Sequence, residues 1–163
     1  MAFAGPAPLI RPTGSRLAFK LATGTFVRVG ALRTGLLSCA PVLSDAVITG
    51  EERPFVGALA WLNAAEAHTP LSEEPQQQGG LIVNEALLET LAQALAGHNA
   101  DEGSAARIGR MAVMARPPDL DAGEITDKGY INQRHVLANR SALVGLLNTD
   151  PPPPGVVIAS RSA

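Results

Sequence analysis

Residues 19–33 read FKLATGTFVRVGALR, and this stretch decides the fold class. Its first half is rich in β-branched and aromatic residues around Gly24, which predicts two short strands that meet at a Thr23-Gly24-Thr25 turn. Leucines at helical spacing follow between Ala31 and Ser38, and Pro41 ends that segment. A hairpin that leads directly into a helix indicates a domain that mixes strands and helices.

The rest of the chain continues this mixture. The apolar runs Ala46–Thr49 and Val56–Leu62 are separated by a polar turn, which predicts a pair of buried strands. Thr69–Gly80 is typical of a loop. Asn84 is placed to cap a helix that Gly97 ends. A strand over Ile108–Ala115 and a single last helix from about Asn132 to Leu147 complete the expected elements, and their irregular alternation predicts a small α+β domain.

Prolines mark the expected limits of this domain. Residues 1–17 hold three prolines with little periodicity and predict an irregular arm. Four consecutive prolines at 151–154 stop any helix and predict a stiff, Pro-rich tail over 151–163. The compact domain is therefore expected over 18–150. We expect the Gly123–Lys128 loop to be exposed and one core to hold Val47, Ile48, Leu59, Trp61, Leu91, Val113 and Leu143.

Composition excludes several classes of function. The chain has 163 residues and a formal net charge of −2, so neither nucleic acid nor an anionic membrane is an expected partner. No apolar run reaches membrane-spanning length, and the N-terminus lacks the pattern of a signal peptide. Cys39 is the only cysteine, which excludes an intramolecular disulfide and favours the cytoplasm. Cys39 closes an apolar helix face and is expected to be a buried, inert thiol.

No metal site is predicted. His68, His98 and His135 share no ligand spacing. The acids between Asp119 and Asp127 fail the calcium-loop pattern, because Gly123 and Tyr130 stand where it needs oxygen ligands. We therefore interpret these acids, Glu124 included, as a solvated turn.

Lys128 is the main candidate for chemistry. It lies in the stretch DAGEITDKGYINQR at 121–134, in a polar loop just before the last helix. A lysine ammonium on a flexible stem suits anionic oxygens, and Gly129 lets the backbone approach a ligand or another domain closely. The alternative is an ordinary surface lysine that pairs with Asp127 or Glu124. Arg28 and Arg33 offer a weaker candidate, either a phosphate site or a solvated helix end.

Three segments resemble feruloyl-CoA synthases, which are members of the AMP-forming acyl-CoA ligase superfamily. They are FKLATGTFVRVGALR at 19–33, DAVITG at 45–50 and GEITDKGYINQR at 123–134, and the resemblance covers roughly residues 18–147. It implies the small C-terminal domain of an adenylate-forming ligase, with a short β-hairpin and a mixed sheet packed with helices.

The resemblance also implies residue roles. Lys128 would be the catalytic lysine of acyl-adenylate formation. The Thr23-Gly24-Thr25 turn would face coenzyme A after a domain rotation, and Ala18, Phe19 and Lys20 would form the hinge region, where the family usually has an acidic residue at the first position. ATP with Mg²⁺ and coenzyme A would be substrates of the complete enzyme.

The sequence contains no glycine-rich phosphate loop and nothing like the family's large ATP-binding domain. We therefore expect a domain that binds no cofactor alone and turns over nothing without a large N-terminal adenylation domain supplied in trans. The alternative is a non-catalytic remnant or interaction module, such as a truncated gene product, that has kept the fold.

Overall fold

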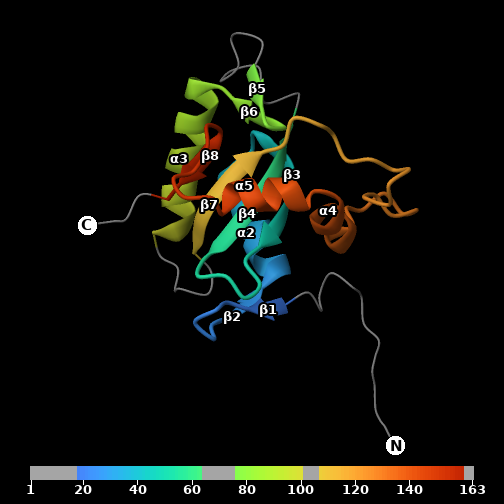
Figure 1. Ribbon diagram of the computed structural model, residues 1–163, viewed down its shortest axis with the longest axis horizontal. Coiled ribbons are helices and arrows are strands. Elements are labelled where there is room, and N and C mark those ends of the chain that lie inside the picture. Colours follow the sequence, from blue (N-terminus) through green and yellow to red (C-terminus); the bar gives the residue numbers. More distant parts are fainter. Residues whose placement is uncertain (1–17, 64–75, 101–106, 160–163) are drawn as a thin grey trace, which may run out of the picture.

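Figure 1 shows the computed structural model of the protein, which describes residues 18–63, 76–100 and 107–159. The predicted arm at 1–17 lies outside the described residues. The central sheet has the strand order β3-β4-β7-β8, and it is mixed because β4 and β7 run parallel while the other neighbours are antiparallel. The α+β prediction is confirmed. The elements are β1 (Ala18–Lys20), β2 (Phe26–Arg28), α2 (Val29–Cys39), β3 (Leu43–Thr49), β4 (Val56–Leu62), β5 (Gln76–Gln78), β6 (Leu81–Val83), α3 (Glu85–Asn99), β7 (Ile108–Val113), α4 (Gln133–Asn139), α5 (Ser141–Leu147) and β8 (Val156–Ile158).

The first hairpin is present as the sequence predicted. β1 and β2 pair antiparallel with Phe19 opposite Val27, and Gly24 in the turn has a φ of 88°. Glycine reaches this left-handed region without the steric penalty that a Cβ brings. α2 follows directly and buries Val29, Leu32 and Leu36.

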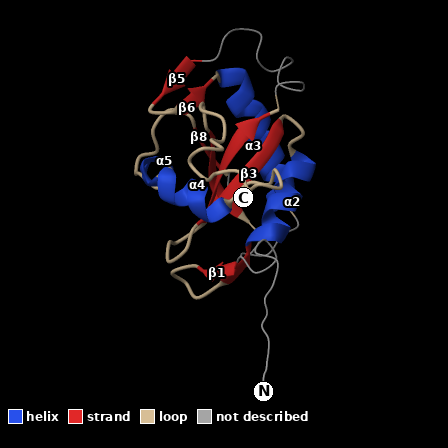
Figure 2. Cartoon of the chain, turned by 90° about the vertical axis from the view of Figure 1, so that its right-hand side faces the viewer, coloured by secondary structure: helices blue, strands red, loops and turns tan. Residues whose placement is uncertain are grey.

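Helices cover both faces of the central sheet. Figure 2 shows α2 and α3 on one side of the sheet and α4 and α5 on the other. The sheet therefore divides the core into two clusters, because successive side chains of a strand point to opposite faces. Ile48, Leu91 and Val113 belong to the cluster under α2 and α3, whereas Val47, Leu59 and Trp61 belong to the cluster under α4 and α5.

The prediction of one core was wrong for this reason. Leu143 also differs from expectation, since it is only partly buried at the edge of the second cluster.

The expected last helix is two helices. α4 ends at Asn139 and α5 begins at Ser141, and between them Arg140 has the non-helical angles φ −112° and ψ 34°. A continuous apolar stripe predicted one helix, but the Arg140 side chain turns inward at this point toward a buried partner described below.

The expected loop at Thr69–Gly80 ends in a second hairpin. β5 and β6 pair antiparallel around Gly79 and Gly80, whose φ values of 64° and 88° form the tight turn; residues 64–75 of this loop lie outside the described residues. Asn84 then caps α3 as predicted, with its Oδ1 accepting from the Leu87 N–H at 2.8 Å. The helix continues two residues past Gly97, to Asn99.

The chain after the four prolines returns to the sheet. The sequence placed these residues in an extended tail, but β8 pairs antiparallel with β7, and Val157 is buried. Arg110 of β7 stabilises this return, because its guanidinium donates to the carbonyls of Leu147 and Thr149 and pairs with Asp150.

Candidate functional site

Lys128 lies at the tip of a tight hairpin. The Gly129 N–H donates to the Thr126 carbonyl at 2.9 Å, and the Thr126 N–H donates to the Tyr130 carbonyl at 2.7 Å. Gly129 has a φ of 85°, and the Thr126 hydroxyl accepts from the Tyr130 N–H at 3.1 Å. This bonding fixes the backbone of a short loop and leaves the lysine side chain free to extend.

The surroundings of Lys128 are open. The side chain is exposed, and among the described residues it has no hydrogen bond or ion pair. Glu124 points elsewhere, into a buried ion pair with Arg140. The ion pair with Asp127 or Glu124 that the alternative expects is therefore not formed among the described residues.

The Thr23-Gly24-Thr25 turn has the same bonding pattern. The Gly24 N–H donates to the Leu21 carbonyl at 2.9 Å, and the Leu21 N–H donates to the Thr25 carbonyl at 2.9 Å. The hydroxyls of Thr23 and Thr25 lie 3.0 Å apart and hydrogen bond to each other. A Cβ added at Gly24 would have no neighbour within 4 Å, so this turn too presents an open, polar backbone.

The two turns lie at different edges of the domain. In Figure 1 the β1–β2 hairpin lies at the bottom, and the orange loop before α4 extends to the right. The hairpin is attached by its backbone, because the Ala22 N–H donates to the Arg53 carbonyl and the Glu52 N–H donates to the Lys20 carbonyl. The structure therefore does not bring Lys128 and the threonine turn into one site within this chain.

A buried ion pair supports the lysine loop, and sequence reasoning missed it. Glu124 and Arg140 are only 1% and 3% exposed, and the Arg140 Nη2 lies 2.8 Å from the Glu124 Oε1. The hydrogen bonds from Arg140 hold the pKa of the Glu124 carboxyl below its usual value, so the carboxylate stays charged. The interpretation of Glu124 as a solvated acid was wrong, as was the expectation that the whole Gly123–Lys128 loop is exposed.

One signal in the sequence identifies this pair. Arg140 follows Val136 by four residues and precedes Leu143 by three, so it lies on the apolar stripe of the expected last helix. A charged residue on such a stripe requires a buried partner, because an unpaired charge is costly to bury. An acid in the loop just before the helix was the nearest candidate.

The remaining acids of the loop do not form a cation site. The Asp119 Oδ1 accepts from the N–H groups of Asp121 and Ala122, which makes it a turn-forming residue. Over residues 18–63, 76–100 and 107–159, no three His, Cys, Asp or Glu side chains gather in a way that could hold a metal ion.

In those same ranges, no helix has both the length and the apolar character needed to cross a membrane.

The other candidates have ordinary surroundings. Arg33 forms an ion pair with Asp45 at 2.6 Å, so it belongs to the contact between α2 and β3, and Arg28 lies exposed at the start of α2. Cys39 is exposed, contrary to expectation, because it is the last residue of α2 and lies beyond the buried stripe. His98 is buried in α3, His135 is exposed in α4, and His68 lies outside the described residues.

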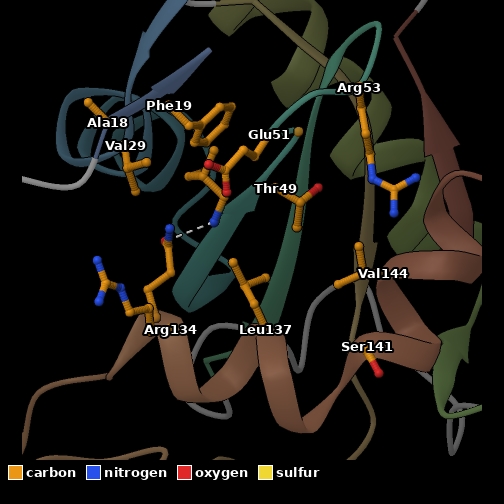
Figure 3. A pocket seen from close by; sticks show the side chains of 13 residues that line it. Ala18, Phe19, Val29, Thr49, Glu51, Arg53, Arg134, Leu137, Ser141 and Val144 are labelled. Carbon is orange, nitrogen blue, oxygen red and sulfur yellow. Dashed lines mark hydrogen bonds between the residues drawn. The ribbon is translucent and has the colours of Figure 1, made fainter. Parts of the chain in front are cut away.

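A pocket of about 310 Å³ lies between β1, the β3–β4 turn and the helices α4 and α5 (Figure 3). Figure 3 shows Leu137 and Val144 pointing into it from the helices, with Phe19 on the opposite wall. The Gln133 Oε1 accepts from the Ile48 N–H at 3.0 Å and so fastens α4 to the edge of β3. The predicted hinge residues Ala18 and Phe19 therefore lie across this pocket from α4, the helix that follows the lysine loop.

The geometry defines a small α+β domain that presents two tight polar turns, one of which carries Lys128, a lysine that is exposed and unpaired among the described residues. The family described as the AMP-binding enzyme C-terminal domain matches residues 20–144. The chain therefore belongs to this family of AMP-binding enzyme C-terminal domains. A search of curated proteins gave no match.

Solved structures agree on the fold. The A-PCP didomain of carboxylic acid reductase from Segniliparus rugosus, in complex with AMP, superposes with a TM-score of 0.61 at 17% identity, over 80% of this chain and 17% of that one. The adenylation domain of the carboxylate reductase from Mycobacterium chelonae superposes with a TM-score of 0.60 at 18% identity, over 80% of this chain and 19% of that one. This chain thus spans less than a fifth of the length of these structures.

Proposed function

We propose that this chain is the lysine-bearing C-terminal domain of an ATP-dependent aryl- or acyl-CoA ligase similar to feruloyl-CoA synthases. One observation carries the proposal: Lys128 is exposed and unpaired among the described residues, at the tip of a hydrogen-bonded turn. The motif resemblance at 19–33 and 123–134 supports the aryl-CoA ligase class, and the complex of one structural neighbour with AMP is consistent with a nucleotide substrate.

Lys128 would act in the first half-reaction. A carboxylate attacks the α-phosphate of ATP, and the acyl-adenylate and pyrophosphate are formed. The ammonium would bridge the two anionic groups as they join and would stabilise the charge that develops there. Removal of one such electrostatic group typically costs about 10²–10³ in rate.

The second half-reaction would use the other turn. The thiol of coenzyme A attacks the acyl carbon of the adenylate, and AMP leaves. The Thr23-Gly24-Thr25 turn would line the path of the thiol arm, where the absent Gly24 side chain leaves room for it. Both half-reactions need a large adenylation domain, which would supply the acyl pocket and most of the contacts to ATP. Mg²⁺ would enter bound to ATP.

The test adds this chain to the large domain of a feruloyl-CoA synthase that lacks its own C-terminal domain. We expect ferulate adenylation, measured as pyrophosphate release, to require both parts, and the chain alone to show no ATP–pyrophosphate exchange. Lys128→Ala should slow adenylation by about 10²–10³, while preformed feruloyl-adenylate should still react with coenzyme A. Asp127→Ala is the matched control, because it removes a side chain from the same turn and keeps the cation.

Gly24→Trp should give the opposite defect. The added ring should obstruct the thiol path and slow thioester formation, while adenylation is spared. Gly24→Ala is its control, since it brings the same backbone strain at a φ of 88° with almost no bulk. Equal loss of both half-reactions in Lys128→Ala, or no loss in either, would contradict the assigned role. Exchange activity of the isolated chain would overturn the need for a large domain.

A further inference from the structure

The ion pair between Glu124 and Arg140 is unusual because it is almost fully buried. The Arg140 Nε donates to Glu124 Oε2 at 2.9 Å and its Nη2 donates to Glu124 Oε1 at 2.8 Å, so both carboxylate oxygens are held in a fork. Such a pair seldom stabilises a fold more than well-packed apolar residues would, because desolvation offsets the attraction. The pair is therefore weak evidence of a gain in overall stability, and a positional role becomes the more informative question.

Arg140 connects the start of the lysine loop to the core. Its remaining donors reach the carbonyls of Arg116 and Pro117, each at 2.8 Å, which lie just after the end of β7. Its guanidinium carbon lies 5.5 Å from the centroid of the Trp61 ring, and the Trp61 Nε1 donates to the same Arg116 carbonyl at 3.0 Å. The start of the loop, just after β7, is thus fixed to the central strand β4.

Glu124 connects the middle of the loop to both of its ends. Its Oε1 accepts from the Asp119 N–H at 2.9 Å, and its own N–H donates to the Asp119 carbonyl at 3.0 Å. Its carbonyl accepts from the N–H of Asn132, the residue that caps α4, at 2.8 Å. The bridge between Ile125 and Ile131 follows directly, so Glu124 lies at the base of the hairpin whose tip is Lys128.

We infer that Glu124 and Arg140 are positioning residues for Lys128: their buried fork fixes the base of the hairpin and thereby the place that the lysine can reach. This inference rests on the proposed function, in which Lys128 serves adenylation. The break between α4 and α5 is part of the same arrangement, because it turns the Arg140 side chain inward toward Glu124. A displacement of a reacting group by about 1 Å can cost about 10² in rate. A more mobile base of the hairpin would displace Lys128 and so slow adenylation.

The test replaces both charges with apolar side chains of similar size, Glu124→Leu with Arg140→Met. The double variant should remain folded, because no unpaired charge is left in the core. We expect its adenylation rate at saturating substrate, measured with the added large domain, to fall by about 10². The reaction of preformed adenylate with coenzyme A should stay unchanged. Amide hydrogen exchange at Thr126 and Gly129 should accelerate in this variant, while exchange in α3 does not.

A second variant, Arg140→Lys, provides a test that does not depend on whether the double variant folds. Arg140→Lys retains the charge but loses the fork, and it should give a smaller loss in the same half-reaction. If the double variant adenylates at the rate of the unmodified protein while Lys128→Ala is slow, the positioning role is overturned and the proposed function of Lys128 stands. No effect of Lys128→Ala would overturn the proposed function and the inference that depends on it.

Discussion

Gly57→Ala is the substitution for which the structure gives the most direct stability estimate. Gly57 lies opposite Thr49 in the β3–β4 register, on the face that α5 covers. An added Cβ would lie 2.6 Å from the Thr49 Oγ1 and 2.6 Å from the Leu147 Cδ2. Favourable carbon contacts need about 3.5–4.0 Å. Because Leu147 is fully buried, its side chain or α5 must shift within a packed core, at a cost of about 1–3 kcal/mol.

Gly97→Ala is the matched control. It lies within α3, and an added Cβ would meet nothing within 4 Å. Alanine there should stabilise the protein by about 0.5–1 kcal/mol, because glycine loses more backbone entropy in a helix. The two variants should therefore differ in unfolding free energy by roughly 1.5–4 kcal/mol.

Thermal unfolding followed by circular dichroism measures this difference. For a chain of this size, 1 kcal/mol changes Tm by about 2–4 °C, so Gly57→Ala should lower Tm by about 2–12 °C and Gly97→Ala should raise it. An unchanged Tm for Gly57→Ala would refute the reasoning, because it would mean that α5 does not pack closely on the sheet. A loss in Gly97→Ala equal to that in Gly57→Ala would show a general intolerance of glycine replacement instead.

Two further predictions concern the core. Leu91→Ala should lower the unfolding free energy by about 2–5 kcal/mol in urea titrations, because the side chain is fully buried between α3 and the sheet, and a midpoint that barely moves would contradict that packing. Acid should lower the free energy of unfolding through Glu124, because Arg140 lowers the pKa of this carboxyl. The charged carboxylate therefore contributes its full stabilisation above the usual pKa of 4.5, and this stabilisation is lost as the pH falls through the lowered pKa. Urea titrations at several pH values should show that the Glu124→Leu, Arg140→Met double variant loses less unfolding free energy in acid than the unmodified protein does. Equal losses in the two proteins would refute the assignment of the acid effect to Glu124.

Local patterns were enough to predict the elements that form around short-range signals. The hairpin at Thr23-Gly24-Thr25 follows from a glycine at a positive φ between β-forming residues, and the start of α3 follows from the Asn84 cap. The pairing of β3 and β4 follows from two apolar runs joined by a short polar turn. Each depends on residues that are close in the sequence, so its physical cause is visible there.

The missed features depend on contacts between distant residues. Strand β8 pairs with β7, and Arg110 holds the chain near Asp150 just before it, a contact of which the four prolines give no sign. The division of the core follows from helices on both faces of the sheet. In the candidate site, the sequence located Lys128 and its turn, but the burial of Glu124 depends on a partner sixteen residues away.

The two turns have the same backbone pattern but different supports, and this difference bears on the proposed mechanism. The hairpin around Gly24 is attached through backbone hydrogen bonds from Ala22 to Arg53 and from Glu52 to Lys20, whereas the lysine hairpin is fixed by a buried ion pair. One support ends on the turn between β3 and β4, and the other ends beside Trp61 of β4. Under the proposed function, a rotation at the predicted hinge residue Ala18 would carry the two turns together, and their different edges would present them at different places.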